Sequence, residues 1–393
     1  MTGKPLHGLR VVEVGSTLSA PYCGLLLAQL GAEVLKVEPP HGDITRQIGA
    51  ARSPGMASLF LALNTDKQSI VLDLRSHRGR EQLHSLIGDS DVVLHNMRPD
   101  AAQRAGLAAE EVRSRHPSVV LCAIQGYATG SGAENRPVYD DIAQAESGMV
   151  SVQAALSGRP SYVATVLADK ASGMMAALAI LAALRRRDRT RRGAVIEIPM
   201  VDVTTGFALL EHLAGETFDP AVGPPVYRRV TSPHRGPYRT ADGWLSVTIY
   251  TAAQWERFLT HIGRADLLRD PRFASVAGRS ANIDQLYRLL EELMPTTTTS
   301  NWLDLFAQLD IPAAEVRDVA SVISERGARA ITHTLAHPTE GKLRFLPLGV
   351  RIDGKQLRPD RPPPLLGEHT EQALRRRAGR TATPETSERS ILG

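Results

Sequence analysis

The chain has 393 residues, of which 42% are hydrophobic and 22% are charged, and its net charge is +4. These values are typical of a soluble globular protein with enough chain for two domains. The mild positive charge favours anionic ligands but is too small to indicate nucleic acid. The start of the chain has no apolar signal segment, and no run of about eighteen apolar residues follows, so we do not expect the protein to bind a membrane. Cys23 and Cys122 lie far apart in the sequence and belong to no cysteine motif, which favours the cytoplasm.

The first forty residues predict a βαβ unit, with strands at 9–14 and 34–38 on either side of a helix at 20–30. Two strands joined through a helix lie parallel in one sheet. Glu38 ends the second strand, where dinucleotide-binding folds carry an acidic residue. The intervening turn at 15–21 reads GSTLSAP rather than GxGxxG, so a NAD-dependent oxidoreductase is the weakest of the alternatives.

Strands and helices continue to alternate as far as residue 214. Further strands are expected at 69–74, 91–94, 118–124 and 194–198, with helices at 78–87 and 201–213. This order predicts a doubly wound, Rossmann-like α/β domain over residues 1–214. Proline and glycine then mark a linker at 215–230, followed by a smaller α+β domain at 231–327 and a segment of short-strand character at 328–393.

Four arginines fall at the ends of predicted strands or in the loops that follow them: Arg46, Arg75, Arg98 and Arg104. Such loops border the ligand crevice of an open parallel sheet. The planar guanidinium offers paired donors that match phosphate, so these positions indicate a phosphorylated ligand. The arginine-rich run at 185–193 reads as a helix end, and the absence of neighbouring aromatic residues there argues against nucleic acid.

Asp169 stands where an extended segment gives way to an apolar helix. One interpretation is an N-cap, whose carboxylate accepts hydrogen bonds from the first helical N–H groups. The other is a nucleophile, because a carboxylate can attack an activated acyl carbon and divide one transfer into two steps. The local pattern leaves both open.

Several segments in this order and spacing resemble the family III coenzyme A transferases, also called the CaiB/BaiF or formyl-CoA transferase family. They are residues 31–39 (GAEVLKVEP), 42–43 (GD), 67–75 (KQSIVLDLR), 96–99 (NMRP), 106–107 (GL), 139–140 (YD), 144–145 (QA), 147–148 (SG), 166–173 (VLADKASG), 270–273 (DPRF) and 363–370 (PPLLGEHT). The resemblance covers nearly the whole chain. It implies a Rossmann-like large domain completed by residues 328–393, a smaller domain between two linkers, and two such rings interlocked as a homodimer.

The resemblance also implies a binding site for coenzyme A on the large domain. Arg104 and Arg75 match positions that contact the adenosine phosphates, and Leu72 and Met97 match positions beside the adenine. The matching segments add further candidates for coenzyme A binding, namely Asn96, Arg98, Arg46 and Glu38. An acyl-CoA and a small carboxylic acid are the expected partners, without NAD or a metal.

Asp169 matches the family's nucleophile. The mechanism that this implies passes through an acyl-aspartyl anhydride and then an aspartyl-CoA thioester, in a site that must exclude water. The alternative within the family is an α-methylacyl-CoA racemase, which uses a His and a Glu where this chain has Tyr139 and Ala252. Tyr139, a candidate catalytic residue, has a hydroxyl whose ordinary pKa is near 10 and suits proton exchange poorly. A coenzyme A-binding protein without turnover is the alternative from another class.

The residues that would contact the substrate acid depart most from the family. The formyl-CoA transferase branch has a Gln where this chain has Leu18, and its glycine-rich flap falls at residues 230–236, which contain one glycine. His234 or Arg235 in that segment is a candidate for holding a second carboxylate, and Gln144 is a further candidate for substrate binding. The identity of the acid is therefore not predicted.

Overall fold

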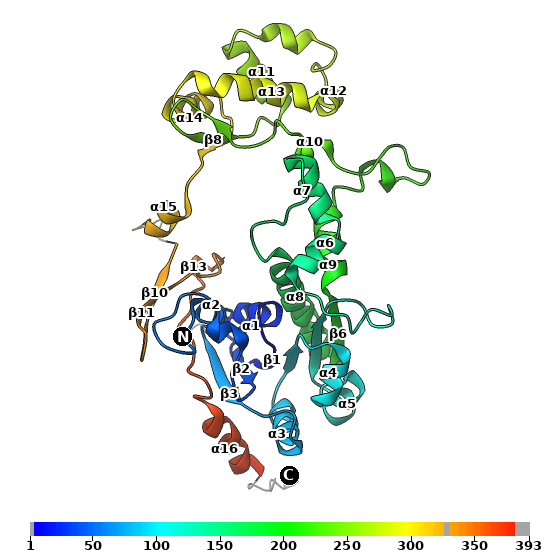
Figure 1. Cartoon of the computed structure of the whole chain (residues 1–393), viewed down its shortest axis with the longest axis vertical. Helices are drawn as coiled ribbons and strands as arrows, with labels where there is room; N and C mark the ends of the chain where they lie inside the picture. The colour runs from blue at the N-terminus through cyan, green and yellow to red at the C-terminus, as the bar shows by residue number, and fades with distance from the viewer. Residues whose placement is uncertain (1–3, 326–330, 382–393) are drawn as a thin grey trace, which may run out of the picture. The chain divides into compact units, whose positions relative to one another are not determined.

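The structure is a computed structural model that describes residues 4–325 and 331–381 (Figure 1). Its contacts divide the chain into two compact units. The first comprises residues 1–147, 164–207 and 330–393, and the second comprises residues 148–163 and 208–329. The sequence placed residues 148–163 in the first domain, whereas the structure groups them with the second unit, because α7 (Met149–Ser157) packs against α10 (Arg228–Thr231).

A six-stranded parallel sheet organises the first unit, in the order β3-β2-β1-β4-β5-β6. Its strands are β1 (Arg10–Val14), β2 (Glu33–Glu38), β3 (Lys67–Val71), β4 (Val92–His95), β5 (Val120–Gln125) and β6 (Ala194–Pro199). The strand order reverses between β1 and β4, which is the doubly wound arrangement predicted from the alternation of strands and helices. The α/β fold class is confirmed.

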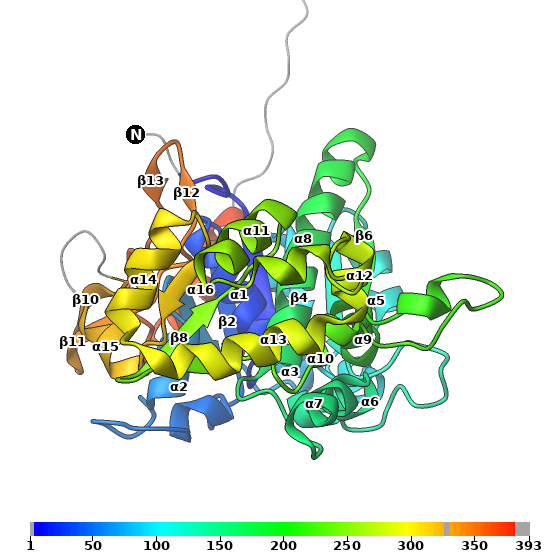
Figure 2. The same cartoon turned by 90° about the horizontal axis from the view of Figure 1, so that it is seen from above.

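Apolar side chains alternate between the two faces of this sheet. Val11 and Val92 belong to one buried cluster, and Val12 and Val93 belong to the other. Successive strand residues point to opposite faces, and a parallel sheet is buried on both, which explains the almost unbroken apolar runs in the strands. Helix α1 (Ser19–Gln29) packs against α8 (Leu167–Thr190), and both are labelled in Figure 2.

The helices of the first unit have the following bounds: α1 (Ser19–Gln29), η1 (Ile44–Gln47), α2 (Ser58–Leu63), α3 (His77–Gly88), α4 (Pro99–Arg104), α5 (Ala109–Arg115), α6 (Asp140–Glu146), α8 (Leu167–Thr190), α9 (Met200–Leu209) and α16 (Thr370–Thr381). The returning segment adds two antiparallel pairs, β10 (His333–His337) with β11 (Gly341–Phe345) and β12 (Arg351–Ile352) with β13 (Lys355–Gln356). It also supplies α16, which packs against α3 and β3.

The strand predicted at 69–74 is displaced in the structure, where β3 ends at Val71. Its register is set by β2, with Val34 opposite Lys67 and Glu38 opposite Val71. The two residues after Glu38 are prolines, which end β2 because they lack the N–H that a sheet requires. The residues after Val71 are thereby released into the loop that borders the cleft described below.

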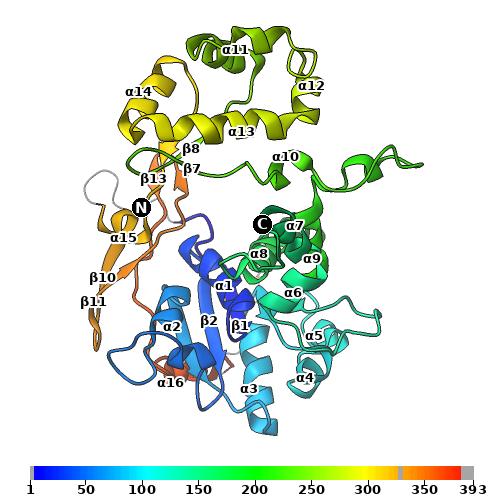
Figure 3. The ribbon, with the colours of Figure 1, turned by 45° about the horizontal axis from the view of Figure 1, so that its top comes forward.

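The second unit contains a small antiparallel sheet and a group of helices, visible in Figure 3 around α11 and α13. The sheet has the order β7 (Tyr238–Arg239), β8 (Trp244–Val247) and β9 (Ala313–Glu315). The remaining elements are η2 (Ala214–Thr217), α11 (Ala252–His261), η3 (Ala265–Arg269), α12 (Val276–Ala281), α13 (Ile283–Leu293), η4 (Met294–Thr296), α14 (Thr299–Gln308) and α15 (Val319–Ser324). Their core is rich in aromatic side chains, including Trp255, Phe258 and Phe306.

Helix α8 is long and apolar enough to cross a membrane by length and composition alone. Half of its apolar stretch is buried inside the protein. The helix packs against α1, β5 and β6, and those contacts account for its buried apolar residues. The buried half of its apolar stretch is therefore explained by its place in the core of the first unit.

Candidate active site

A cleft of about 1040 Å³ lies at the carboxyl ends of the parallel strands. Its lining includes a residue that follows each of five strands: Gly15 after β1, Pro39 after β2, Leu72 after β3, Asn96 after β4 and Gly126 after β5. Ligands of open α/β sheets bind in this position, at the point where the strand order reverses. The fold therefore places the cleft where the sequence predicted a binding site.

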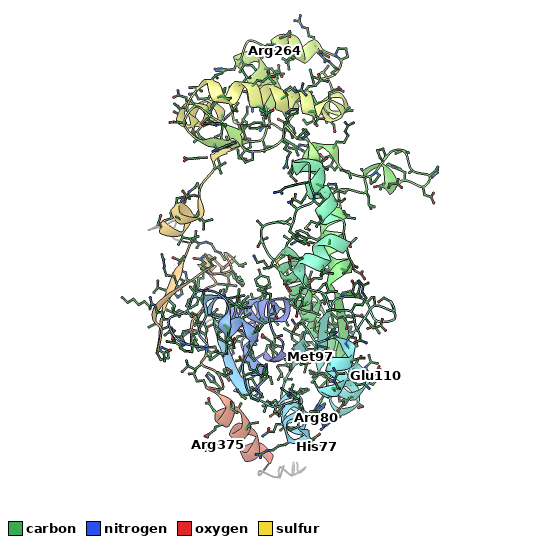
Figure 4. The ribbon with its side chains drawn as sticks, viewed as in Figure 1. His77, Arg80, Met97, Glu110, Arg264 and Arg375 are labelled. Carbon is green, nitrogen blue, oxygen red and sulfur yellow. The ribbon has the colours of Figure 1, made fainter. Side chains whose placement is uncertain are left out.

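Cationic side chains line one part of the cleft. Arg75 follows β3, and its side chain is 85% exposed, with a loose 4.0 Å contact to Asp73. Arg104 ends α4 and is also exposed in the cleft. Arg80 lies on α3 near Met97 in Figure 4, and it donates to the Arg75 carbonyl oxygen (2.9 Å). The structure thus brings Arg75 and Arg104 to one cleft with their guanidinium groups exposed.

Leu72 and Met97 lie in the lining of the same cleft. Leu72 is buried, and Met97 is packed against the buried cluster that covers one sheet face. Arg98 is the N-cap residue of α4, and its guanidinium donates to the Asn135 carbonyl oxygen (3.0 Å). The cleft wall therefore carries both apolar and cationic groups.

Asp169 lines the cleft at a point where three helices begin. It is the third residue of α8, its carboxylate accepts hydrogen bonds from the hydroxyl and backbone N–H of Ser19, and Ser19 is the first residue of α1. Its own backbone N–H donates to Asp140 Oδ1 (3.2 Å), and Asp140 is the first residue of α6. Helix α8 has Val166 at its N-cap without a side-chain capping bond, so the N-cap interpretation of Asp169 is wrong.

The environment of Asp169 disfavours its charged form. Burial raises the pKa of this carboxyl group from 3.8 to about 7, and the nearby charge of Asp140 adds to the effect, while the hydrogen bonds from Ser19 oppose it. The residue is only 7% exposed although it lies in the cleft. A desolvated carboxylate is more reactive toward an acyl carbon than a hydrated one, so burial here favours a chemical role.

Close packing of α1 on α8 brings Ser19 to Asp169. Gly173 lies one turn after Asp169, and a Cβ atom added there would come within 2.8 Å of the Ser19 carbonyl oxygen. Asn96 Nδ2 in turn donates to Ser19 Oγ (3.2 Å). Glycine at position 173 is therefore a requirement of the contact between the two helices.

Tyr139 and Gln144, both predicted at the site, have different surroundings. Tyr139 precedes α6, lines the cleft and is 68% exposed, so its hydroxyl is accessible to a ligand. Gln144 is buried, and its Nε2 donates to Asp140 Oδ2 (2.5 Å) and to the Thr165 carbonyl oxygen (3.4 Å). Gln144 therefore orients Asp140 instead of contacting a substrate in the cleft.

Arg46 and Glu38 are a buried pair. The Arg46 guanidinium donates to both Glu38 oxygens (2.7 and 2.8 Å), and Ser69 Oγ donates to the same carboxylate (2.6 Å). Burial tends to raise the pKa of Glu38, but Arg46 and Lys36 outweigh it and lower that pKa. Glu38 also lines the cleft, but its carboxylate is engaged by Arg46 and Ser69, so the structure gives this pair a role within the core, and its contact with coenzyme A stays a prediction.

Leu18 is not among the residues that line the cleft. Leu18 is the half-buried N-cap residue of α1. His234 and Arg235 belong to the second unit, where the His234 ring contacts Glu291 Oε2 (2.7 Å) and Arg288 (3.2 Å). His234 thus has charged neighbours of its own within that unit.

Sequence reasoning missed Ser19 and Asp140 as parts of the site. Asp140 was present in the matched segment at 139–140, which was the available signal, whereas Ser19 had none beyond its place in the βα turn. Within the described residues, no group of three or more His, Cys, Asp or Glu side chains is placed to hold a metal ion. Cationic groups and a buried carboxylate in one cleft are instead the arrangement of an enzyme for an anionic ligand.

The comparisons with known proteins agree with this class. Residues 6–370 match the family described as CoA-transferase family III. The chain is 34% identical over 315 residues to the "Probable fatty acyl-CoA transferase Rv3272" of Mycobacterium tuberculosis, which covers 77% of this chain and 80% of that protein. It is 30% identical to the formyl-CoA:oxalate CoA-transferase of Streptomyces coelicolor, over 95% of both chains. It is 29% identical to the succinyl-CoA:glutarate CoA-transferase of Mus musculus, over 95% of this chain and 86% of that protein.

Solved structures show the same relationship. A crystal structure of a mutant of Rv3272 from Mycobacterium tuberculosis has a TM-score of 0.82 and 30% identity, covering 95% of this chain and 99% of that chain. A CAIB/BAIF family protein from Brucella suis has a TM-score of 0.78 and 28% identity, covering 96% of this chain and 100% of that chain. The chain belongs to CoA-transferase family III and is a CoA-transferase, as the sequence resemblance predicted.

Proposed function

We propose that this protein moves coenzyme A between an acyl-CoA and a carboxylic acid, with Asp169 as the nucleophile. The observation that carries the proposal is the buried Asp169 carboxylate, held by Ser19 at the wall of a cleft that also exposes arginine. The printed names of two relatives, for formyl-CoA:oxalate and succinyl-CoA:glutarate transfer, support a carboxylic acid as the acceptor.

The cleft suggests how an acyl-CoA would lie. Arg75 and Arg104 offer exposed guanidinium groups for the adenosine phosphates, and Leu72 and Met97 offer apolar contacts for the adenine. Asn96 and Arg98 line the same wall. Asp169 lines the same cleft, so we expect the thioester end of the ligand to lie beside it.

The proposed reaction has four steps, and Asp169 takes part in each of them. The Asp169 carboxylate attacks the donor thioester carbonyl, which forms a mixed anhydride and expels the coenzyme A thiolate. The thiolate attacks the aspartyl carbonyl, which releases the donor acid and leaves an aspartyl-CoA thioester. The acceptor carboxylate attacks that thioester, which forms a second anhydride and again frees the thiolate. Attack of the thiolate on the acceptor's carbonyl yields the new acyl-CoA and restores Asp169.

Oxygen labelling tests this sequence, because the bridging oxygen of the second anhydride comes from the acceptor and stays on Asp169. After turnover with acceptor labelled with ¹⁸O in its carboxylate, mass spectrometry of the peptide that contains Asp169 should show a gain of label. The Asp169→Asn variant should bind coenzyme A with nearly unchanged affinity but transfer nothing. Turnover without label on Asp169 would contradict the mechanism.

A parallel experiment addresses the racemase alternative. A chiral 2-methylacyl-CoA incubated with the protein in deuterated water gains deuterium at the α-carbon only if a proton is exchanged there. We expect no incorporation, since Tyr139 replaces the histidine of that mechanism. Incorporation at a rate comparable to turnover would favour the racemase.

We also propose that the protein is a homodimer. Large apolar side chains are exposed on α8 and α9 of the chain alone, namely Met174, Met175, Leu178 and Phe207. Exposed apolar surface of this kind marks a contact surface. Light scattering after size exclusion should give twice the chain mass of 42.6 kDa, and Leu178→Glu should shift the protein toward the monomer mass.

A further inference from the structure

The loop between β1 and α1, residues 15–18, forms part of the cleft wall and leads into the helix start that contacts Asp169. Its backbone is strained at Thr17, a β-branched residue with φ of 68°. A threonine keeps this left-handed conformation only where surrounding contacts hold it. The loop conformation must therefore be fixed from outside.

Two side chains form hydrogen bonds to consecutive peptide groups of this loop. The amide of Asn96 accepts from the Ser16 N–H (3.1 Å) and donates to the Ser16 carbonyl oxygen (2.8 Å). Asp43 Oδ1 accepts from the Thr17 N–H (3.3 Å). All three bonds are made to backbone groups, so they constrain the path of the loop itself.

Lys36 is the third side chain that holds the loop by a hydrogen bond to its backbone. Its Nζ donates to the Gly15 carbonyl oxygen (2.8 Å) and to Glu13 Oε1 (3.0 Å), and it forms an ion pair with Asp43 Oδ2 (2.8 Å). The ammonium group thus makes two hydrogen bonds and one ion pair with oxygen atoms. Burial alone would lower the pKa of Lys36, but Glu13 and Asp43 outweigh it and raise that pKa, so the side chain is charged.

Lys67 forms the opposite half of the same network. Its Nζ lies 2.8 Å from Glu13 Oε2, and it donates to the Pro21 carbonyl oxygen in the first turn of α1 (2.7 Å) and to Asn64 Oδ1 (3.0 Å). A Cβ atom added at Gly24 of α1 would lie only 1.9 Å from Glu13 Oε2. The backbone of α1 thus packs directly against the Glu13 carboxylate.

The buried charge cluster, which we define as Lys36, Lys67, Glu13 and Asp43, contains two cations and two anions with no side chain more than 1% exposed. Well-packed apolar residues stabilise a core as well as a buried ion network does. Stability alone therefore does not account for four charged residues beneath one strained loop.

We propose that the buried charge cluster is a positioning device, which holds the loop at 15–18 and the first turn of α1 so that Ser19 meets Asp169. This inference rests on the proposed function, in which Asp169 is the nucleophile. The cluster touches only backbone groups of the loop and helix, so its members are positioning residues and take no part in the covalent steps.

The test uses a variant that keeps the buried charges balanced. Lys36→Met combined with Asp43→Asn removes one cation and one anion, and the amide at position 43 keeps an oxygen for the Thr17 N–H. The hydrogen bond from Lys36 to the Gly15 carbonyl oxygen is lost. We expect amide hydrogen exchange at residues 15–19, measured by mass spectrometry, to become at least about tenfold faster.

Turnover is measured with succinyl-CoA and glutarate, and binding is measured with free coenzyme A by calorimetry. In the double variant kcat should fall about tenfold to hundredfold, since a small misplacement of a reacting group has effects of this size. The dissociation constant of coenzyme A should stay within about twofold, because Arg75 lies in the loop after β3 and Arg104 at the end of α4, both outside residues 15–18.

Leu83→Ala is the matched control, because Leu83 is fully buried on α3 in the cluster that covers the other sheet face. It should lower the melting temperature without faster exchange at 15–19 and without loss of kcat. Unchanged exchange at 15–19 in the double variant, or equal acceleration in Leu83→Ala, would overturn the inference. If the double variant fails to fold, Asp43→Asn alone should give smaller changes in the same direction, namely faster exchange at residues 15–19 and a lower kcat. If Asp43→Asn changes neither quantity, the inference is also overturned.

The exchange measurement does not depend on activity. If the unaltered protein transfers no coenzyme A and gains no label on Asp169, the proposed function fails, and the exchange comparison still decides whether the cluster positions the loop. Fast transfer combined with unchanged exchange would instead leave the function standing and remove the positioning role.

Discussion

Replacing Asp169 with asparagine should stabilise the protein while abolishing transfer, because the folded state holds this carboxyl group in unfavourable surroundings. Its pKa is about 7 in the folded protein against 3.8 as the ordinary value. The folded state therefore binds more protons than the unfolded state between these two values, and stability is lost as pH rises through that window. Above pH 7 the whole effect is present, and below pH 3.8 it vanishes.

The size of this effect follows from the shift. A difference of about 3 pKa units corresponds to about 4 kcal/mol at about 1.4 kcal/mol per unit, and relaxation of the site reduces it, so we expect about 2–4 kcal/mol at pH 7 or above. An asparagine at this position avoids the cost because it carries no charge and still accepts from Ser19. Residues placed for chemistry commonly weaken the fold in this way.

Urea unfolding of both proteins between pH 4 and pH 8 measures the prediction, since the other titrating groups largely cancel in the difference. The stability gain of Asp169→Asn should rise through this range and level off above pH 7. Asp141→Asn, at an exposed carboxylate on α6, is the control and should show no such rise. A gain that is equal at pH 4 and pH 7 would refute the reasoning about Asp169.

Three further predictions concern activity. The acid limb of kcat/KM should lie at about pH 7, where Asp169 ionises, and Asp140→Asn should move it to lower pH by removing a neighbouring negative charge; a limb that stays in place would contradict this cause. Arg104→Ala should raise KM for acyl-CoA about tenfold with little change in kcat, and an unchanged KM would exclude the phosphate contact. Gly173→Ala should lower kcat at least about tenfold, because its Cβ would press on the start of α1, whereas Gly206→Ala, with open space around it, should not; equal kinetics in the two variants would disprove that contact.

The parallel sheet could be predicted because its pattern is local. The βαβ unit at the start of the chain has apolar runs of strand length on either side of a helical spacing, and the structure has β1, α1 and β2 there. The end of β3 could not be predicted in the same way. It depends on where β2 stops, and that partner lies thirty residues away in the chain.

The arginines show how far the candidate site could be predicted from the sequence. Arg46 and Arg75 both looked like phosphate ligands, since each follows a predicted strand. In the structure Arg75 is exposed in the cleft, whereas Arg46 is buried against Glu38. The distinction depends on which carboxylate lies within reach after folding, and that is a property of packing that a linear pattern does not contain.

The sequence by itself determined the family and the order of the elements, and it predicted Asp169 as the nucleophile, because each of these inferences rests on residue types at fixed spacings. Only the tertiary structure decided what surrounds that carboxyl group. Ser19, Asp140 and Asp169 come from three separate helix starts, and they meet because parallel strands deliver their following loops to one edge of the sheet. The raised pKa of Asp169 is a consequence of that meeting.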